Sequence, residues 1–364
     1  MREDYSWSMN SRLNSLSTSL NGPVMVTGHT GFKGTWLTLL LEKLGVEVIG
    51  YSLEPEKDSL YARIGREGMI SEKFADVRNF TAVQKFVDIT KPVAVIHLAA
   101  QPLVLESFRS PRETFDTNVM GTVNLLESAF KSESVLAFLA ITTDKVYKNE
   151  NKGLAFKESD ALAGKDPYSA SKVGSEAAVD AWQQISKSLG GPRVTAIRAG
   201  NVIGGGDWAK NRLVPDLIRG FSSHEAVRVR NPLSTRPWQH VLDPVIGYLM
   251  TLQEILSGTN IDSINFGPTE SSLTVNEVVN IAKESWGGNA QIIIDQPADT
   301  IYEATELELD SSFAKELLNW KPIWSQKESV TATLEWWKNL IIEKQDPFNL
   351  CRSDIEFALN RVVS

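Results

Sequence analysis

A glycine-rich stretch near the start of the chain constrains the fold more than any other feature. The apolar residues 24–26 predict a short buried strand, and the apolar run 36–41 predicts a helix packed on a sheet. Between them lie Gly28, Gly31 and Gly34. Glycine lets the backbone turn sharply and approach a phosphate, and a helix N-terminus offers free N–H donors and a partial positive charge. The stretch therefore predicts a dinucleotide-binding turn, spaced G-x-x-G-x-x-G and not as the common G-x-G-x-x-G.

The rest of the chain extends this beginning into an α/β fold. Further apolar runs with the length and composition of strands alternate with segments of helical periodicity, at 45–51, 93–100, 135–141, 194–198 and 263–268. Alternating strands and helices are typical of a parallel sheet covered on both faces. We therefore expect a doubly wound parallel sheet of the Rossmann type with a smaller C-terminal lobe that holds a substrate.

The boundaries expected for these parts are as follows. Residues 22–200 form the dinucleotide-binding domain, and residues 241–266 return to it after the second lobe has begun. The remainder of 201–364 forms the substrate lobe. Residues 1–21 are rich in serine and asparagine and lack the apolar core of a secretory signal, so we expect a loose polar extension.

The composition excludes several classes of protein. The 364 residues carry a formal net charge of −8, which gives no support for a nucleic-acid or membrane-surface partner. No apolar run approaches the span of about 20 residues that a membrane helix needs. The single cysteine, Cys351, excludes an internal disulfide and fits a reducing, cytoplasmic compartment. The four histidines are scattered, so no metal site is expected.

The segment after the second strand bears on which dinucleotide is bound. An acidic residue about 20 positions past the glycines usually holds the ribose hydroxyls of adenosine. Glu54 lies at that distance, but the strand ends near Tyr51 and Ser52, where the acid would more naturally lie. Lys57 and Arg63 are close enough in sequence to favour a 2′-phosphate instead. The segment therefore leaves NAD and NADP both open.

Further residues that could line the cofactor follow in order. Asp76 could accept a hydrogen bond from an adenine amino group, or could equally cap the next helix. Ala99 and Ala100 end a strand and are small enough for a flat cofactor to lie against them. His97 in the same strand has no obvious carboxylate partner. We therefore expect a structural histidine whose ring nitrogens are hydrogen-bonded within the fold, and not a catalytic base. Asn118 lies at the start of the helix that covers the sheet.

A polar cluster follows the strand at 135–141. Thr142, Thr143, Asp144 and Lys145 lie at its C-terminal end. In open α/β sheets this end of the strands is where ligands bind. A hydrated turn is an equally good reading of these four residues taken alone.

The segment that decides between these readings is Asp166-Pro167-Tyr168-Ser169-Ala170-Ser171-Lys172. Proline suits the first turn of a helix, so Tyr168 and Lys172 stand four residues apart on one helical face. A nearby ammonium stabilises a phenolate, and we expect it to lower the pKa of Tyr168 from its ordinary value of about 10. Tyr168 could then take a proton from a sugar hydroxyl while hydride leaves for the cofactor.

The order Thr-Gly-x-x-Gly-x-x-Gly, Thr143 and Tyr168-x-x-x-Lys172 resembles the extended short-chain dehydrogenase/reductase family, which acts mainly on nucleotide-sugars. Glycines 204–206 beside Asn201 offer amide donors that suit an anionic ligand. Arginines in the following loops could clamp a pyrophosphate, and Arg212 and Arg236 are the strongest candidates.

The sequences of several segments resemble those of one subgroup of that family, the CDP-glucose 4,6-dehydratases. The segments are GHTGFKG at 28–34, QPLV at 101–104, NVMGT at 118–122, RAGNVIGGGDW at 198–208 and RPWQHVLDP at 236–244. The chain departs from the subgroup at Leu105, where an arginine is usual, and in the shorter loop 148–156. Both departures bear on the sugar pocket or its cover.

The resemblance implies a cofactor, a substrate and a set of residues. NAD would be the cofactor, and CDP-glucose would become CDP-4-keto-6-deoxyglucose plus water. Tyr168, Lys172 and Thr143 would serve oxidation at C4, with Asp144 as acid and Lys145 as base in the elimination. Gln101, Asn201, Arg212 and Arg236 would contact the substrate. The implied cofactor contacts are Gly28, Thr30, Gly31, Phe32, Lys33, Gly34, Asp76, Val77, Leu98, Ala99, Ala100, Asn118, Tyr168 and Lys172.

Two other functions share part of this pattern. A nucleotide-sugar 4-epimerase needs Tyr168 and Lys172 but not the Asp144-Lys145 pair. A non-catalytic NAD-binding sensor needs neither, because it has no use for a polarised phenol. The resemblance also implies a homodimer, or a higher homo-oligomer, through a two-helix face.

Overall fold

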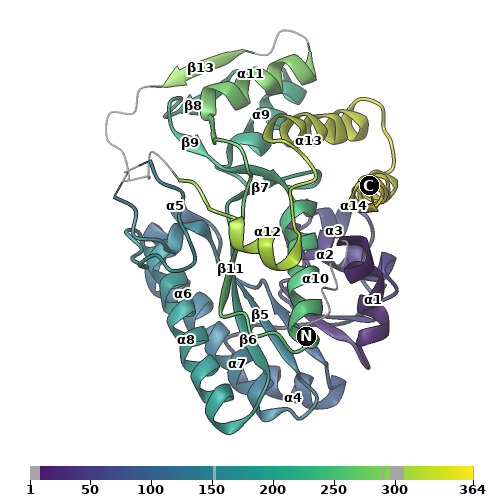
Figure 1. The fold of residues 1–364 in the computed structure, drawn as a ribbon. Coiled ribbons are helices and arrows are strands. Elements are labelled where there is room, and N and C mark those ends of the chain that lie inside the picture. Colours follow the sequence, from purple (N-terminus) through teal and green to yellow (C-terminus); the bar gives the residue numbers. More distant parts are fainter. Residues whose placement is uncertain (1–8, 151–152, 288–290, 296–306, 364) are drawn as a thin grey trace.

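A seven-stranded parallel sheet lies at the centre of the computed structural model, which describes residues 9–150, 153–287, 291–295 and 307–363 (Figure 1). The strand order is β11-β6-β5-β4-β1-β2-β3 and every pairing is parallel. The chain thus winds outward from β1 in both directions, which confirms the doubly wound sheet. The strands are β1 (Val24–Thr27), β2 (Val48–Ser52), β3 (Ser71–Phe74), β4 (Ala94–His97), β5 (Ala137–Ile141), β6 (Arg193–Ala199) and β11 (Ser263–Phe266).

Helices cover both faces of the sheet, because alternate residues of each strand point to opposite sides. Val24 and Val26 of β1 pack in one cluster with α2, whereas Met25 packs in another with α4, α7 and α8. Strands β1, β2, β4 and β5 are buried throughout, as expected for a parallel sheet covered on both faces. The longer helices of these layers are α2 (Phe32–Lys43), α10 (Leu242–Leu256), α4 (Phe80–Thr90), α7 (Gly121–Lys131) and α8 (Pro167–Leu189).

Short helical segments connect the layers and carry several of the predicted site residues. They are α3 (Leu60–Arg63), α5 (Val104–Arg109), α6 (Pro111–Phe115), the π-helical η1 (Asp116–Met120) and the single 3-10 turn η2 (Asp144–Val146). The π-helical segment joins α6 directly to α7.

The C-terminal lobe is built from pairs of short strands and from helices. β7 (Asn201–Ile203) pairs with β10 (Trp238–His240), β9 (Thr235–Arg236) with β12 (Leu273–Thr274), and β8 (Val227–Arg230) with β13 (Ile292–Asp295). Between them α10 packs on the central sheet and β11 pairs with β6 at its edge. The remaining helices are α9 (Leu213–Ser223), α11 (Val275–Trp286), α12 (Ser312–Leu318), α13 (Gln326–Ile341) and α14 (Pro347–Val363).

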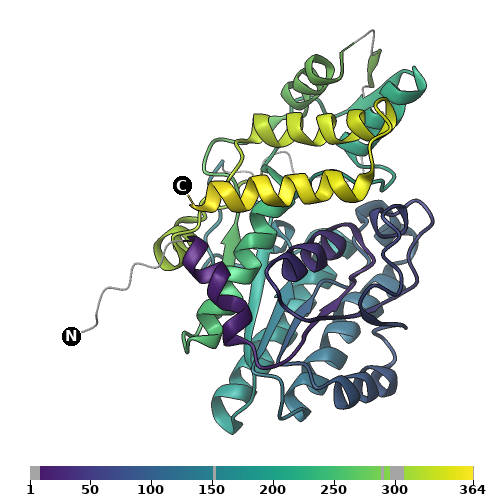
Figure 2. The same cartoon turned by 90° about the vertical axis from the view of Figure 1, so that its right-hand side faces the viewer.

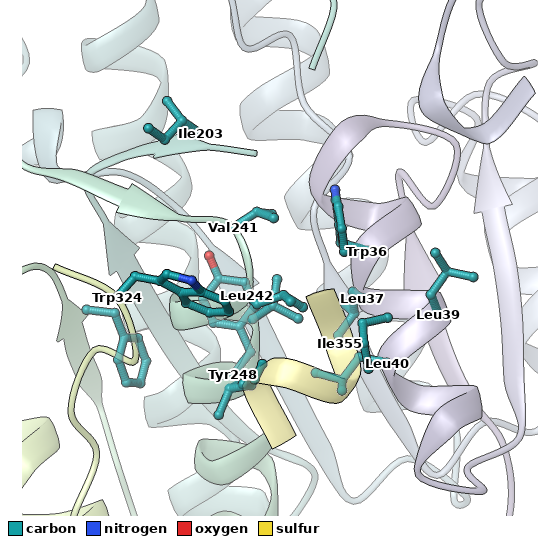
Figure 3. Packing of buried hydrophobic residues seen from close by; sticks show 14 of the residues in the cluster. Trp36, Leu37, Leu39, Leu40, Ile203, Val241, Leu242, Tyr248, Trp324 and Ile355 are labelled. Atoms are coloured by element: carbon teal, nitrogen blue, oxygen red, sulfur yellow. The ribbon is translucent and has the colours of Figure 1, made fainter. Parts of the chain in front are cut away.

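The larger core cluster runs from the sheet into this lobe. Figure 3 shows Trp36 and Leu37 of α2, Leu242 and Tyr248 of α10 and Ile355 of α14 packed in one cluster. The indole N–H of Trp36 donates to the carbonyl oxygen of Gly205 at 2.9 Å, so the helix that follows the glycine-rich turn is bonded directly to the loop after β7.

The N-terminal segment differs from the loose extension we expected. Residues Met9–Ser19 form helix α1, which contacts α10 and α14 (Figure 2). Leu13 and Leu16 lie three residues apart and are both buried in the core cluster. The segment has only these two well-placed leucines, so its composition resembles that of a disordered tail although one face of the helix is apolar.

Among the described residues, no helix is long and apolar enough to cross a membrane. Within the same ranges, no three histidine, cysteine, aspartate or glutamate side chains come together as a metal site would require.

Candidate active site

The glycine-rich turn joins β1 to α2, and each of its glycines has a different role. Gly28 has a φ of +70°, and a Cβ there would lie 2.8 Å from the backbone nitrogen of Ala99. A Cβ on Gly34 would overlap the carbonyl oxygen of Gly28. A Cβ on Gly31 would meet only that carbonyl, at 3.3 Å, so the space beside Gly31 stays free for a ligand. Two glycines thus permit the tight turn and the third leaves a cradle.

The start of α2 supplies the donors that this cradle needs. Gly31 is the N-cap residue and no side chain caps the helix there, so the first amides of Phe32 and Lys33 face the cradle without a competing side chain. This geometry fits the pyrophosphate of a dinucleotide. The Thr30 hydroxyl hydrogen-bonds to Ser52 at 2.8 Å, at the end of β2 where a ribose-binding acid usually lies. Glu54 is exposed beyond that end.

Arg63 does not extend towards this ribose position. Its Nε donates to the carbonyl oxygen of Asp58 at 3.0 Å, and its guanidinium carbon lies 5.4 Å from the ring centroid of Trp208 and 5.8 Å from that of Trp337. The arginine thus packs against the C-terminal lobe, which removes it as a partner for a 2′-phosphate.

Asp76 and Val77 follow β3. The Asp76 carboxylate accepts hydrogen bonds from Arg78, which lowers the pKa of Asp76. The cap of the following helix is Asn79, whose side chain accepts from the Ala82 amide at 3.1 Å, so the interpretation of Asp76 as an N-cap is wrong. The Val77 side chain is buried against Gly121, which leaves mainly its backbone available to a cofactor.

The strand β4 ends beside the glycine-rich turn. His97 is satisfied on both ring nitrogens, by Thr27 at 2.7 Å and by Thr122 at 3.0 Å, as expected. Burial lowers the pKa of His97 to about 3. Leu98, Ala99 and Ala100 follow as a partly buried, small-residue edge next to the turn.

The side chains of Asn118 and Gln101 form hydrogen bonds within the protein and do not line an open surface. Asn118 accepts from the Gln101 amide at 2.7 Å and donates to the Gln101 carbonyl at 3.1 Å and to Ser171 at 2.8 Å. The Gln101 side chain donates to Thr114 and to Leu103 and accepts from the Leu103 amide. The Asn118 side chain therefore ties the loop after β4 to α8, and the Gln101 side chain ties the same loop to α6.

The polar cluster after β5 and the start of α8 come together as the sequence predicts. Asp166 caps α8 by accepting from the Ser169 amide at 2.9 Å, and Pro167 occupies the first turn. Tyr168 and Lys172 are both buried on the same helical face. The Thr143 hydroxyl donates to Asp144 at 2.9 Å and lies close enough to Tyr168 to affect the pKa of the phenol.

The ionisation of Tyr168 differs from the expectation. Burial raises the pKa of Tyr168 to about 12, with a smaller contribution from the negative charge of Asp144, and the hydrogen bond from Thr143 opposes the rise. The Lys172 ammonium, which we expected to lower it, donates instead to the carbonyl oxygen of Ile141 at 3.3 Å. The phenol is therefore neutral in this state, and a cationic ligand is needed to favour the phenolate.

A second buried lysine, Lys33, lies near Lys172 and Asp144. Burial, Lys172 and Arg212 together lower the pKa of Lys33 to about 7, and Asp144 opposes them. Burial likewise lowers the pKa of Lys172 to about 8. The Lys33 ammonium lies 3.5 Å from the Tyr248 hydroxyl. Lys33 thus lies near two other cationic side chains, Lys172 and Arg212, which suits an anionic ligand.

Lys145 and Arg236 line a cavity beside this cluster. The cavity also has Tyr147, Asp166 and Ser169 on its wall, and so opens at the N-terminal turn of α8. Lys145, and Arg236 from β9, therefore both line one space beside the start of α8.

The comparisons with known proteins agree with this geometry. The model of the NAD dependent epimerase/dehydratase family matches residues 24–267. The chain belongs to this family. A CDP-glucose 4,6-dehydratase from Salmonella typhimurium is 40% identical over 324 residues, which cover 86% of this chain and 90% of that protein. A dTDP-glucose 4,6-dehydratase from Shigella flexneri is 25% identical over 86% of this chain and 92% of that protein.

The fold is shared with solved members of the family. A dTDP-glucose 4,6-dehydratase from Streptomyces venezuelae, with NAD and TYD bound, has a TM-score of 0.77 at 22% identity and covers 89% of this chain and 99% of its own. A UDP-glucose 4-epimerase from Thermotoga maritima, with UDP-glucose, has the same TM-score and identity over 87% and 99%. The resemblance read from the motifs is thereby confirmed, and NAD is the cofactor of this family member.

The remaining predicted substrate residues lie at the boundary between sheet and lobe. Arg212 is the N-cap residue of α9; its Nη1 donates to Asp207 at 3.1 Å, and its charge acts on Tyr168. Asn201 opens β7 and pairs with Trp238. Glycines 204–206 are explained by packing, because a Cβ on Gly205 would overlap Trp336; the interpretation of these glycines as an anion site has no support in the contacts.

Three residues of the site were missed from the sequence. Glu176 and Arg198 form a buried ion pair beneath the cluster, and Tyr147 joins it. Glu176 could have been found, because it follows Lys172 by four residues and so shares its helical face. Nothing in the sequence pairs Arg198 with it, since the two meet only when β6 lies beside α8. Residues 151 and 152 of the shorter loop 148–156 lie outside the described ranges.

Proposed function

We propose that this protein is a CDP-glucose 4,6-dehydratase, which converts CDP-D-glucose to CDP-4-keto-6-deoxy-D-glucose and water. The observation that carries the proposal is the placement of two kinds of proton-transfer group at one strand end. Tyr168 and Lys172 suit oxidation of a hydroxyl, and Asp144 and Lys145 beside them suit an elimination. The 40% identity to the Salmonella enzyme supports the nucleotide-sugar.

The first step is oxidation at C4. When bound, NAD accepts the hydride from C4 and later supplies it to C6. Tyr168 takes the C4 hydroxyl proton, and Thr143 supports the phenolate through its hydrogen bond. The charge of Arg212 favours the ionised phenol that burial disfavours, and Lys172 stands one helical turn away on the same buried face of α8.

The second step removes water across C5 and C6. The 4-ketone acidifies the C5 proton, which Lys145 takes. Asp144 gives a proton to the departing C6 hydroxyl, so that water leaves. One oxygen of the buried Asp144 carboxylate accepts from Thr143, and the other has no partner among the described residues. That free oxygen is suited to hold the proton that the leaving group needs.

A separate set of residues binds the diphosphate. Arg236 on β9 and Arg212 at the start of α9 lie on the lobe side of the site, and each can offer a planar pair of donors. Lys33, whose buried amine lies near Arg212, stands in the first turn of α2 beside the glycine-rich turn. These cations supply the charge that a nucleoside diphosphate sugar requires.

Incubation with CDP-glucose, UDP-glucose and dTDP-glucose tests the proposal. We expect a 4-keto-6-deoxy product from CDP-glucose, followed by nuclear magnetic resonance, at a rate well above that of the other two. Formation of the C4 epimer without loss of water would identify a 4-epimerase. Binding of NAD without turnover of any of the three sugars would identify a sensor.

We propose further that the protein is a homodimer in the cytoplasm. The surface formed by α5, α6 and η1 beside α8 is apolar, because Phe108, Phe115 and Met120 are exposed on it. The single cysteine supports a reducing compartment. Light scattering of the purified protein and of a Phe115→Glu variant tests the dimer, and cell fractionation tests the compartment.

A further inference from the structure

A third side chain shares the buried face of α8 with Tyr168 and Lys172. Glu176 follows Lys172 by four residues and is fully buried. Its carboxylate accepts two hydrogen bonds from Arg198, from Nε at 3.0 Å and from Nη2 at 2.8 Å. The Thr142 hydroxyl donates to the same carboxylate at 2.5 Å. A buried bidentate ion pair of this kind gives a well-defined geometry and is costly to break from one side.

The third nitrogen of Arg198 extends this arrangement to Tyr147. Nη1 donates to the Tyr147 hydroxyl at 2.9 Å and to the carbonyl oxygen of Glu158 at 3.1 Å. The guanidinium also lies 5.0 Å from the centroid of the Tyr147 ring. The Tyr147 hydroxyl in turn donates to the Asn265 side chain on β11 at 2.7 Å.

This network holds both ends of one short segment. Thr142 immediately precedes Thr143, Asp144 and Lys145, and Tyr147 lies two residues after Lys145. The segment itself is a single 3-10 turn, and its two backbone hydrogen bonds are long, at 3.4 Å each. Such a turn has little rigidity of its own. Its position is therefore set by what holds its ends. Backbone hydrogen bonds fix the main chain there, from Thr142 to Ile197 at 2.8 Å and from Ala163 to Val146 at 2.9 Å, and the Glu176–Arg198 pair holds the Thr142 and Tyr147 side chains at the two ends.

We propose that Glu176, Arg198 and Tyr147 are positioning residues that keep Asp144 and Lys145 in register with Tyr168. This inference rests on the function proposed above, in which Asp144 and Lys145 serve the elimination. Tyr168 and Lys172 are part of α8, and Thr143 directly follows Thr142, which stays bonded to Ile197 at 2.8 Å and to Glu176 at 2.5 Å, so these oxidation residues keep their places when Tyr147 is released from the network. Asp144 and Lys145 lie on the 3-10 turn, so they do not keep their places when Tyr147 is released. Loosening the network at Tyr147 therefore slows the elimination while the oxidation at C4 continues.

The variant Tyr147→Phe tests this with the least disturbance, because it removes one hydroxyl and keeps the ring that stacks on Phe156. Thr195→Val is the matched control: it removes a buried hydroxyl on the same strand as Arg198, where Thr195 donates to Ile261 at 2.6 Å, outside the network. Both proteins are mixed with CDP-glucose in deuterium oxide. Reduced nicotinamide absorbance follows the oxidation, and deuterium at C5 with the 4-keto product follows the elimination.

For Tyr147→Phe we expect C5 exchange and product formation to fall about tenfold, since small misplacements of catalytic groups are costly. The oxidation should change less than twofold, and reduced cofactor should accumulate. For Thr195→Val the ratio of the two steps should stay that of the native protein. Hydrogen exchange measured by mass spectrometry gives a readout without substrate: amides 143–147 should exchange faster in Tyr147→Phe only.

An equal fall of both steps in Tyr147→Phe, or no change in either, would overturn the inference. Arg198→Lys is the second variant, because it keeps the charge but loses the fork and the bond to Tyr147; it must shift the same ratio in the same direction. A failure of this inference can be told apart from a failure of the proposed function. If the native protein makes no 4-keto product, that function is wrong, while the exchange of amides 143–147 still decides whether the network holds the turn.

Discussion

The Thr143 hydroxyl donates a hydrogen bond of 2.9 Å to one carboxylate oxygen of Asp144, and the other oxygen has no partner among the described residues. Both side chains are buried. A buried carboxylate oxygen without a donor costs free energy. A proton or a substrate hydroxyl at that oxygen would remove the cost. The residue is thus prepared for proton transfer in a way that a surface aspartate is not.

Asp144→Asn should separate the two halves of the reaction. The amide keeps the shape of the side chain but cannot deliver a proton, so we expect product formation to fall by about 10² to 10⁴, the usual contribution of a positioned acid. Reduction of bound cofactor by CDP-glucose should persist. Rapid-mixing absorbance and product analysis measure the two. Asp88→Asn, an exposed change on α4, is the control; loss of both signals in Asp144→Asn alone would contradict the assignment.

Tyr168→Phe should abolish both halves. The lost hydroxyl is the group that takes the C4 proton, so no ketone forms and no elimination can follow. Binding of NAD and CDP-glucose, measured by calorimetry, should change little because the ring remains. Residual turnover above about one part in a hundred of the native rate would remove Tyr168 from the first step.

The layers of the fold and the shared helical face of Tyr168 and Lys172 were predictable from the sequence because their signals are local. The glycine spacing before α2 and the four-residue spacing of Tyr168 and Lys172 each lie within one element. The raised pKa of Tyr168 was not predictable, since it depends on how completely other segments bury the phenol. The same holds for Arg198, which meets Glu176 only when α8 packs on β6.

The glycines 204–206 show the opposite failure. Their composition suggested an anion site, but Gly205 lies against Trp336 of α13, more than a hundred residues later in the chain. A glycine that admits a ligand and a glycine that admits a distant side chain are identical in a single sequence. Only the contact separates them: a Cβ on Gly205 would meet Trp336, one on Gly204 would meet Val241, and one on Gly206 would meet Leu60.

Leu13 and Leu16 give a prediction about the N-terminal helix. Both are buried against the core, so Leu13→Ala and Leu16→Ala should each lower the free energy of unfolding by about 2 to 5 kcal/mol. The helix lies away from the site residues, so kcat at a permissive temperature should be unchanged. Urea unfolding and steady-state kinetics measure these. Leu189→Ala, at an exposed leucine, is the control; equal stability of all four proteins would mean that α1 is not docked in solution.

Arg236→Ala should raise KM for CDP-glucose strongly while kcat changes little. A diphosphate clamp binds the ground state and the transition state alike, so its loss appears in KM. Arg236 lines the cavity beside Lys145, whereas Arg352 is exposed on α14 and serves as the control variant. Steady-state kinetics with CDP-glucose decides. An unchanged KM would move the diphosphate site away from β9.

Lys172 gives a prediction in which catalysis and stability oppose each other. Burial lowers its pKa from 10.5 to about 8, so the folded state holds an ammonium that it disfavours. Below about pH 8 the lysine is charged in both the folded and the unfolded chain, and the folded state bears the full cost. Between about pH 8 and 10.5 the unfolded chain binds more protons than the folded one. Stability contributed by this residue therefore rises with pH across that window.

Lys172→Met should consequently be more stable than the native protein at pH 7, by at most about 3 kcal/mol, and should be inactive. The advantage should shrink as the pH rises through 8, to about 1 kcal/mol at pH 10, and vanish above pH 10.5. Urea unfolding at pH 7, 8.5 and 10 measures it. Lys187→Met, on the same helix but exposed, should show no such trend. If Lys172→Met were less stable than the native protein at pH 7, the hydrogen bond to Ile141 and the charge of Glu176 would outweigh burial, and the lysine would be a structural cation as well as a catalytic one.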